Sequence, residues 1–170
     1  RITNLNSGGE NMASIKKTNA MRLLDKDSIS YEVREYEYDE NDLDGHHVAD
    51  SLGLGYEEVY KTLVAKGESG QYYVFCLSVD DEVDLKKAAV IAKEKRIELI
   101  HVKELLPLTG YIRGGCSPIG MKKKFKTFVD EMVLLVDKVN VSGGQRGIQI
   151  CLSVADLISC TEATTGDICK

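Results

Sequence analysis

The sequence lacks tryptophan, contains only 2 prolines among 170 residues, and has no CxxC pair among its 5 cysteines. So little proline excludes long Pro-rich linkers, and the chain length suggests a single domain. An odd cysteine count without CxxC spacing indicates neither a disulfide framework nor a zinc knuckle, and it is typical of a reducing cytosolic setting. No apolar run reaches the roughly 18 residues that a membrane span needs. We therefore expect a soluble, cytoplasmic protein that makes no membrane contact.

Basic charge is also scarce, because 22 Lys and Arg residues face 27 Asp and Glu residues, for a net charge of -5. Proteins that coat DNA or RNA usually carry a basic surplus, since much of their affinity comes from neutralised phosphates. We expect no DNA binding, and any RNA must be held through a local patch or through the chemistry of one terminus. The one strong basic cluster is Lys122–Lys124 with Lys126.

The first eleven residues, 1–11, are polar and rich in Gly and Ser, and they lack the apolar core of a signal peptide. Met12, which Ala13 and Ser14 follow, resembles a natural start. We therefore expect residues 1–11 to be an added leader outside the fold and residues 12–170 to form one domain.

Apolar periodicity and turn residues predict interleaved helices and strands. Helices are expected at 19–26, 45–52, 84–95, 102–106 and 153–159, the fourth ending near Pro107. Strands are expected at 31–38, 59–66, 71–79, 97–101, 134–141 and 147–152. Because several strands meet through hairpins, as at Gly67–Gly70, the pattern favours an α+β fold: a mixed, mostly antiparallel sheet with flanking helices. Neither a Walker motif nor a GxGxxG fingerprint is present.

Three short stretches are informative together, and the glycines of the second cannot be explained as the interior of a helix or strand. They are the first motif, Val59-Tyr60-Lys61-Thr62-Leu63; the Gly-rich segment Tyr111–Gly120, with the sequence YIRGGCSPIG; and the third motif, Val141–Gly147, with the sequence VSGGQRG. Each is common alone. Together, in this order and at this spacing, they resemble the YbaK/EbsC family of free-standing aminoacyl-tRNA deacylases, relatives of the editing domain inserted in bacterial prolyl-tRNA synthetases.

The resemblance extends from Lys16 to about Ile158 and implies both a fold and an activity. The family fold is a single compact domain with a curved, barrel-like mixed sheet. The implied reaction is hydrolysis of Cys-tRNA(Pro), the product formed when prolyl-tRNA synthetase accepts cysteine. It implies no cofactor and needs no metal. The partners are then the 3′ aminoacyl-adenosine end of a mischarged tRNA and, as a second partner, prolyl-tRNA synthetase.

The catalytic candidates are Lys61, Gly114 and Gly115. Lys61 alternates with apolar residues on a strand and so needs an anionic partner, which the resemblance makes the terminal phosphate or ester of the tRNA. A surface lysine on an edge strand is the alternative. The two glycines let a ligand approach backbone N–H groups that would form an oxyanion hole. A plain structural turn is the alternative for them.

The resemblance assigns substrate binding to six further residues: Tyr36, Thr62, Ser117, Pro118, Ser142 and Gln149. Tyr36 would stack on the terminal adenosine or hydrogen-bond to it, unless it only pairs with Tyr38 across a strand. Pro118 would stiffen the Gly-rich segment, and Ser117 would hydrogen-bond within it or to the substrate. Ser142 could equally cap a turn.

Better-known family members carry an aspartate where this chain has Gln149. A glutamine cannot accept a proton near neutral pH, which favours a mechanism in which the substrate's own thiol attacks its ester carbonyl. Cys116 has no obvious histidine partner, so a space-filling role is favoured over a nucleophilic one. His46 and His47 adjoin acidic residues at a spacing that suits no common zinc site.

The sequence therefore predicts an aminoacyl-tRNA deacylase that acts in trans on Cys-tRNA(Pro). Two alternatives stay open. One is a deacylase of the same fold for another mischarged tRNA, such as Ala-tRNA(Pro). The other is a non-catalytic module that binds a nucleotide or tRNA end and docks on prolyl-tRNA synthetase. The basic cluster at Lys122–Lys126 either touches the tRNA acceptor stem or forms a solvated face.

Overall fold

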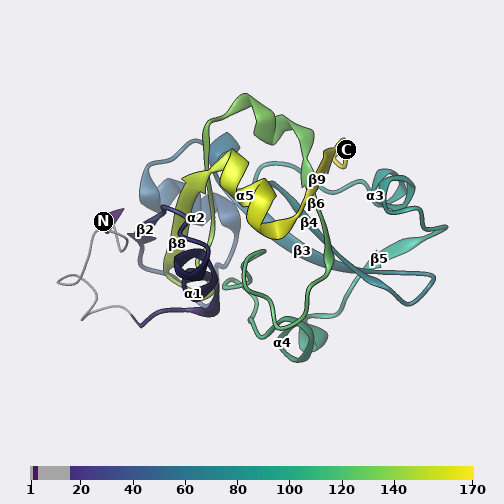
Figure 1. The fold of residues 1–170 in the computed structure, drawn as a ribbon, viewed down its shortest axis with the longest axis horizontal. Helices are drawn as coiled ribbons and strands as arrows, with labels where there is room; N and C mark the ends of the chain where they lie inside the picture. The colour runs from purple at the N-terminus through teal and green to yellow at the C-terminus, as the bar shows by residue number, and fades with distance from the viewer. Residues whose placement is uncertain (1, 4–15) are drawn as a thin grey trace.

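The computed structural model describes residues 2–3 and 16–170, whose strands form two sheets (Figure 1). The first sheet is antiparallel throughout, with the order β1 (Ile2–Thr3), β2 (Glu32–Glu35), β8 (Ile148–Ser153) and β7 (Lys138–Ser142). The second sheet has the order β5 (Ile97–Leu99), β3 (Tyr60–Gly67), β4 (Tyr72–Ser78), β6 (Lys126–Asp130) and β9 (Thr164–Gly166). Its β3 is antiparallel to β4 and β5, whereas β4, β6 and β9 run parallel.

Helices flank both sheets, as the sequence predicts. They are α1 (Asn19–Lys26), α2 (Gly45–Leu52), α3 (Leu85–Ala92), α4 (Val102–Thr109) and α5 (Val154–Thr161), with two short 3-10 helices, η3 (Tyr56–Glu58) and η4 (Glu131–Leu135). Figure 1 shows α1 beside the first sheet and α3 near β5 at the opposite end of the molecule. No helix in the described part of the chain is both long and apolar enough to cross a bilayer.

The two sheets curve around one shared core. Val59, just before β3, forms a parallel bridge to Asn140 of β7, whose amide N–H donates to the Glu58 carbonyl at 3.0 Å. The largest buried cluster contains residues from both sheets, including Ile150 and Val74. The predicted α+β fold with a mixed, mostly antiparallel, barrel-like sheet is confirmed.

Local signals placed most of the helix ends correctly. Thr18 caps α1 by accepting a hydrogen bond from the Met21 N–H, and Asp84 caps α3 in the same way. Gly53 ends α2 in the left-handed region at φ +66°, where a residue without Cβ is favoured. Ser153 caps α5. These are the side chains whose short hydrogen bonds compete with helix interiors and therefore mark helix starts.

Several predicted boundaries were wrong. The strand expected at 31–38 ends at Glu35, because its ladder with β8 ends at the pair Glu35–Ile148, where β8 begins. Tyr36 instead donates its N–H to the Gly147 carbonyl at 3.0 Å. The strand expected at 134–141 begins at Lys138, because the residues before it belong to η4.

Two helices differ from prediction in length. The helix expected at 102–106 continues to Thr109 with Pro107 inside it, and it ends at Gly110 with φ +82°. The Thr109 hydroxyl donates to the Leu105 carbonyl at 2.8 Å, which supports the final turn that the proline weakens. The helix expected at 84–95 ends at Ala92, where Lys93 turns left-handed.

One described feature bears on the expectation that residues 1–11 lie outside the fold. Ile2 and Thr3 pair antiparallel with Arg34 and Val33, so these two residues join the first sheet although they were expected to lie outside the fold. Residues 1 and 4–15, which include the boundary expected at Met12, lie outside the described residues.

Candidate active site

A cavity of about 300 Å³ brings the three motifs together. It lies between the start of β3, the N-terminus of α2, the Gly-rich segment and the adjoining parts of β7 and β8. The predicted site residues that line it are Lys61, Thr62, Gly114, Ser142 and Gln149. Residues more than 80 positions apart in the sequence therefore face one small volume, which is what a binding site for a small polar group requires.

Lys61 is half-buried at this cavity, and its ammonium donates a hydrogen bond to the Asp81 backbone carbonyl. An ammonium group can donate three hydrogen bonds, so this contact leaves capacity for a ligand. Hydrogen bonding from the His46 N–H lowers the pKa of Asp44, and the charge of Lys61 lowers it further. The sequence predicted an anionic partner for Lys61. Within the described chain its hydrogen-bond acceptor is a carbonyl, with the Asp44 carboxylate close enough to feel its charge.

Gly114 forms part of the cavity wall and has φ +82°, a conformation that side chains disfavour. A Cβ there would also approach Leu43 Cδ2 to 3.0 Å. Gly115 has a different role, because its N–H already donates to the Ile112 carbonyl at 2.9 Å. A Cβ on it would lie 3.0 Å from the Arg146 nitrogen, so Gly115 packs the Gly-rich segment against the third motif.

Ser117 and Pro118 stand behind the cavity. Ser117 is fully buried, and its hydroxyl accepts a hydrogen bond from the Ile119 N–H at 3.2 Å. Pro118 lines a separate, larger cavity of about 820 Å³ on the side of α1 and α5. Neither residue belongs to the wall formed by Lys61 and Gly114, and the Ser117 hydrogen bond lies within the Gly-rich segment.

Ser142 and Gln149 lie directly opposite each other on β7 and β8. Both are buried, and the Ser142 hydroxyl accepts a hydrogen bond from the Gly144 N–H at 3.2 Å. Ser142 therefore caps its turn and lines the cavity, and its role in substrate binding stays a prediction. Gln149 is only 5% exposed, and its Oε1 atom has no hydrogen-bond partner among the described residues.

Tyr36 supports Gln149 from the far side of the cavity wall. It packs on the cluster that contains Val48, Val59 and Val79, all of which line the cavity. Burial raises the pKa of Tyr36, and a side-chain hydrogen bond from Gln149 opposes that rise.

Sequence reasoning missed Asp44 and Arg113, which also line the cavity. Asp44 caps α2, and its Oδ1 lies 3.0 Å from His46 Nδ1, while His46 Nε2 lies 2.9 Å from Asp80 Oδ1. The hydrogen bonds that His46 donates to Asp80 first and to Asp44 second raise the pKa of His46. An N-cap signal marks Asp44 as a helix start, but only the packing of α2 against Val59 and Val79 brings it near Lys61.

Cys116 lines the same cavity and is 9% exposed. Burial raises the pKa of its thiol to about 12, so the sulfur is protonated near neutral pH. The thiolate is the nucleophilic form of cysteine. The environment therefore favours the predicted space-filling role over a nucleophilic one.

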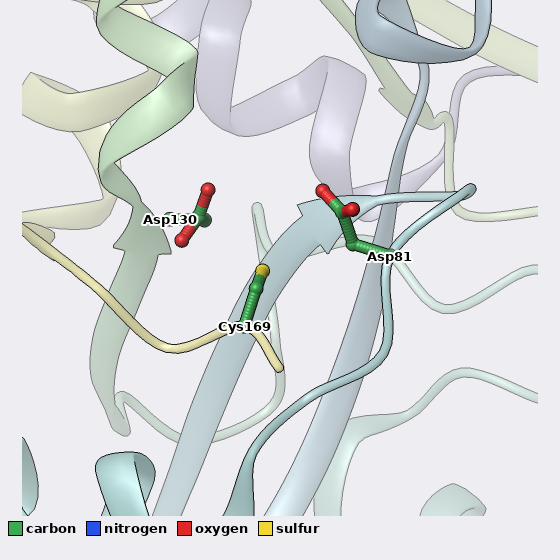
Figure 2. Close-up of side chains that lie close together, drawn as sticks. All are labelled: Asp81, Asp130 and Cys169. Atoms are coloured by element: carbon green, nitrogen blue, oxygen red, sulfur yellow. The ribbon is translucent and has the colours of Figure 1, made fainter.

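One cluster of metal-ligand residue types lies near Lys61. Figure 2 shows Asp81, Asp130 and Cys169 pointing toward one another, with ligand atoms within 4.8 Å. The Asp130 carboxylate already accepts hydrogen bonds from the Met132 and Ile168 N–H groups. Burial and then the Asp130 charge raise the pKa of Cys169 to about 12. The backbone bridge between Val83 and Cys169, together with the Lys170 N–H that donates to the Glu82 carbonyl at 3.0 Å, ties the C-terminal segment to the loop whose carbonyl holds Lys61.

Comparisons with known proteins converge on one group. A sequence model of the aminoacyl-tRNA editing domain matches residues 44–160. The Enterococcus faecalis protein EbsC, named for deacylation of Cys-tRNA(Pro) and Cys-tRNA(Cys), is 40% identical over 153 residues, which cover 90% of this chain and 93% of EbsC.

Solved structures share the fold. One, described as a trans-editing enzyme for prolyl tRNA synthetase, is 23% identical with a TM-score of 0.78 and covers 92% of this chain and 99% of its own. Another, of a hypothetical protein, is 21% identical with a TM-score of 0.82 and covers 90% of this chain and 100% of its own.

Proposed function

This chain belongs to the aminoacyl-tRNA editing domain family, and we propose that it deacylates mischarged Cys-tRNA(Pro) in trans. The name of EbsC supports a cysteinyl substrate, and the size of the cavity supports a small aminoacyl group. The partner is the 3′ aminoacyl-adenosine end of the tRNA, with prolyl-tRNA synthetase as a second partner. The reaction belongs in the cytoplasm, where tRNAs are charged.

The observation that carries this proposal is the unpaired Gln149 oxygen in the same cavity as Lys61. A buried acceptor without a partner costs about 1–3 kcal/mol, which a donor from a ligand recovers. The α-ammonium group of an aminoacyl ester is such a donor, and it reaches the Gln149 oxygen when the buried amide turns toward the cavity. In this assignment Gln149 Oε1 binds the α-ammonium group, and Thr62 and Ser142 form the wall around the side chain.

The chemistry follows from the substrate's thiol. Its sulfur attacks the ester carbonyl carbon, forming a C–S bond and a tetrahedral oxyanion, which the backbone N–H of Gly114 stabilises. When the C–O bond breaks, the thiol proton ends on the 3′ oxygen of the tRNA. The released cyclic thioester then adds water and becomes cysteine. Lys61 binds the anionic groups of the tRNA 3′ end and fixes the ester for attack.

The test is turnover. Catalytic amounts of the protein are incubated with Cys-tRNA(Pro), Ala-tRNA(Pro) and Ser-tRNA(Pro), beside Lys61→Ala and the exposed β3 control Lys66→Ala. We expect loss of the cysteinyl ester only, abolished by Lys61→Ala and retained by Lys66→Ala. Faster loss of alanine would refute the cysteine specificity. If no ester is lost beyond the spontaneous rate, the protein is a binding module and not a deacylase.

A further inference from the structure

A second cavity, of about 250 Å³, adjoins the first. The residues common to both linings are Thr62, Leu63, Arg113, Gly114 and Cys116. The wall between the two volumes therefore consists of the start of β3 and the front of the Gly-rich segment. A ligand that passes over Gly114 would have one end in each cavity.

The strand order explains why both cavities open at this point. β5 covers the edge of β3 only at residues 65–67, and the Ile100 N–H extends the contact to the Val64 carbonyl at 3.1 Å. At the other end, Val59 bridges to Asn140. The stretch of β3 between these two contacts faces the Gly-rich segment, with one cavity on each side.

The two cavities differ in chemistry. Both linings are more apolar than polar, but the charged and amide side chains of Lys61, Asp44 and Gln149 gather in the first. The second is mainly apolar, with His101 at one side and the following apolar residues around it: Leu63, Val64, Leu99, Ile100, Val102 and Leu105. Leu99 and Val102 are 45% and 61% exposed at its rim. Large apolar side chains grouped in water beside a cavity are typical of a ligand site.

We propose that this second cavity binds the adenine ring of the terminal tRNA nucleotide. This inference rests on the proposed function. An aminoacyl-adenosine has a small polar aminoacyl group and a flat aromatic base on either side of the ribose ester. The polar cavity takes the aminoacyl group, the apolar cavity takes the base, and the ester lies over Gly114, where the oxyanion forms.

Two further observations fit this orientation. Arg113 lines both cavities and is exposed, so its guanidinium is available to the 5′ phosphate of the same nucleotide. The Arg146 side chain is held against this segment, because its Nε donates to the Arg113 carbonyl at 2.9 Å. Tyr36, the residue the sequence suggested for the adenosine, packs behind the polar cavity with Val48 and Val59. We therefore assign the contact with the base to residues of β5 and α4.

The test uses a paired variant and a matched control. Leu99→Asn with Val102→Asn removes the apolar rim without touching a fully buried side chain. Leu135→Asn with Val90→Asn makes the same chemical change at positions 75% and 78% exposed, outside both cavity linings. Binding of adenosine 5′-monophosphate is measured by NMR titration, with ribose 5-phosphate as the ligand that lacks a base.

We expect the rim variant to weaken adenosine monophosphate binding about tenfold or more, the scale of one lost base contact, and the control to leave it unchanged. The KM for Cys-tRNA should rise by a similar factor with little change in kcat. Equal affinity in both variants, or equal affinity for ribose 5-phosphate, overturns the adenine subsite. Failure of the proposed function is distinct, since the nucleotide would then bind at this rim while no ester was hydrolysed.

Discussion

Replacing Gln149 with leucine should stabilise the protein while weakening its reaction. The free protein holds a buried amide oxygen without a partner, and removing it relieves about 1–3 kcal/mol. The same change removes the interaction of the Gln149 side chain with Tyr36 that opposes the rise in the Tyr36 pKa, at the cost of one ordinary hydrogen bond, about 0.5–1.5 kcal/mol. Leucine is close in volume, so little cavity cost is expected. The net effect is a gain of about 1 kcal/mol, or about 2–4 °C in Tm at this chain length.

The reaction should respond in the opposite direction. A hydrogen bond from the charged α-ammonium group to Gln149 is worth about 1.5–3 kcal/mol, so kcat/KM for Cys-tRNA should fall about 10- to 150-fold. Thermal unfolding and steady-state deacylation on the same preparations measure both effects. The control is Gln145→Leu, an exposed glutamine in the third motif that should change neither quantity.

The prediction requires that Gln149→Leu raises Tm and lowers kcat/KM for Cys-tRNA. If Gln149→Leu lowers Tm, the amide oxygen is already hydrogen-bonded within the protein and is not free to bind a ligand. If Tm rises but deacylation is unchanged, the unpaired oxygen is real and the α-ammonium group binds elsewhere. Either result removes the observation on which the assignment of the polar cavity rests.

Three further predictions address the same site. Gly114→Ala combines φ +82° with a Cβ 3.0 Å from Leu43, so we expect about 1–2 kcal/mol lower stability and loss of deacylation, measured by denaturant unfolding and turnover. The Cys116 thiol has its pKa raised to about 12, so Cys116→Ala should keep activity within a few-fold, and iodoacetamide should modify the native thiol slowly at pH 7; rapid inactivation would contradict this. Hydrogen bonds to Asp80 and Asp44 raise the pKa of His46 above 6.5, which an NMR pH titration should show directly. Because the folded pKa is the higher one, the stabilisation from His46 is complete below the unfolded pKa and is lost as pH rises through the folded pKa, and His46→Gln should remove that dependence.

Local chemistry made most of the fold predictable, and tertiary pairing accounts for the rest. Caps such as Thr18 and Ser153 bond within their own first turn, so their effect can be recognised in a short window of sequence. β6 and β9 escaped prediction because each forms only by adding to an edge: β6 pairs parallel with β4, and β9 pairs parallel with β6. A five-residue strand that begins with an exposed lysine, as β6 does, has too little alternation to stand out.

The site residues also fall into those that the sequence indicated and those that only the packing shows. Glycine and lysine at positions that regular structure does not need pointed to Lys61 and Gly114, and both line the cavity. Asp44 and Arg113 escaped because their neighbours in sequence do not signal which cavity they face. Tyr36, in contrast, was placed against the substrate and lies behind the wall. A motif identifies which segments meet, but the side of a wall on which each side chain lies depends on how the segments pack.

Packing also explains why much of the Gly-rich segment lies away from the cavity. Its rear is anchored three times: the Tyr111 hydroxyl donates to the Ile119 carbonyl at 2.6 Å, Gly115 packs on Arg146, and a Cβ at Gly120 would lie 2.7 Å from the Asn19 carbonyl oxygen of α1. Such contacts hold backbone donors in place before a substrate arrives, and donors that need no reorganisation stabilise developing charge best. Most of the motif is therefore the support that fixes Gly114 between the two cavities, and chemistry at that one position depends on packing against α1 and the third motif.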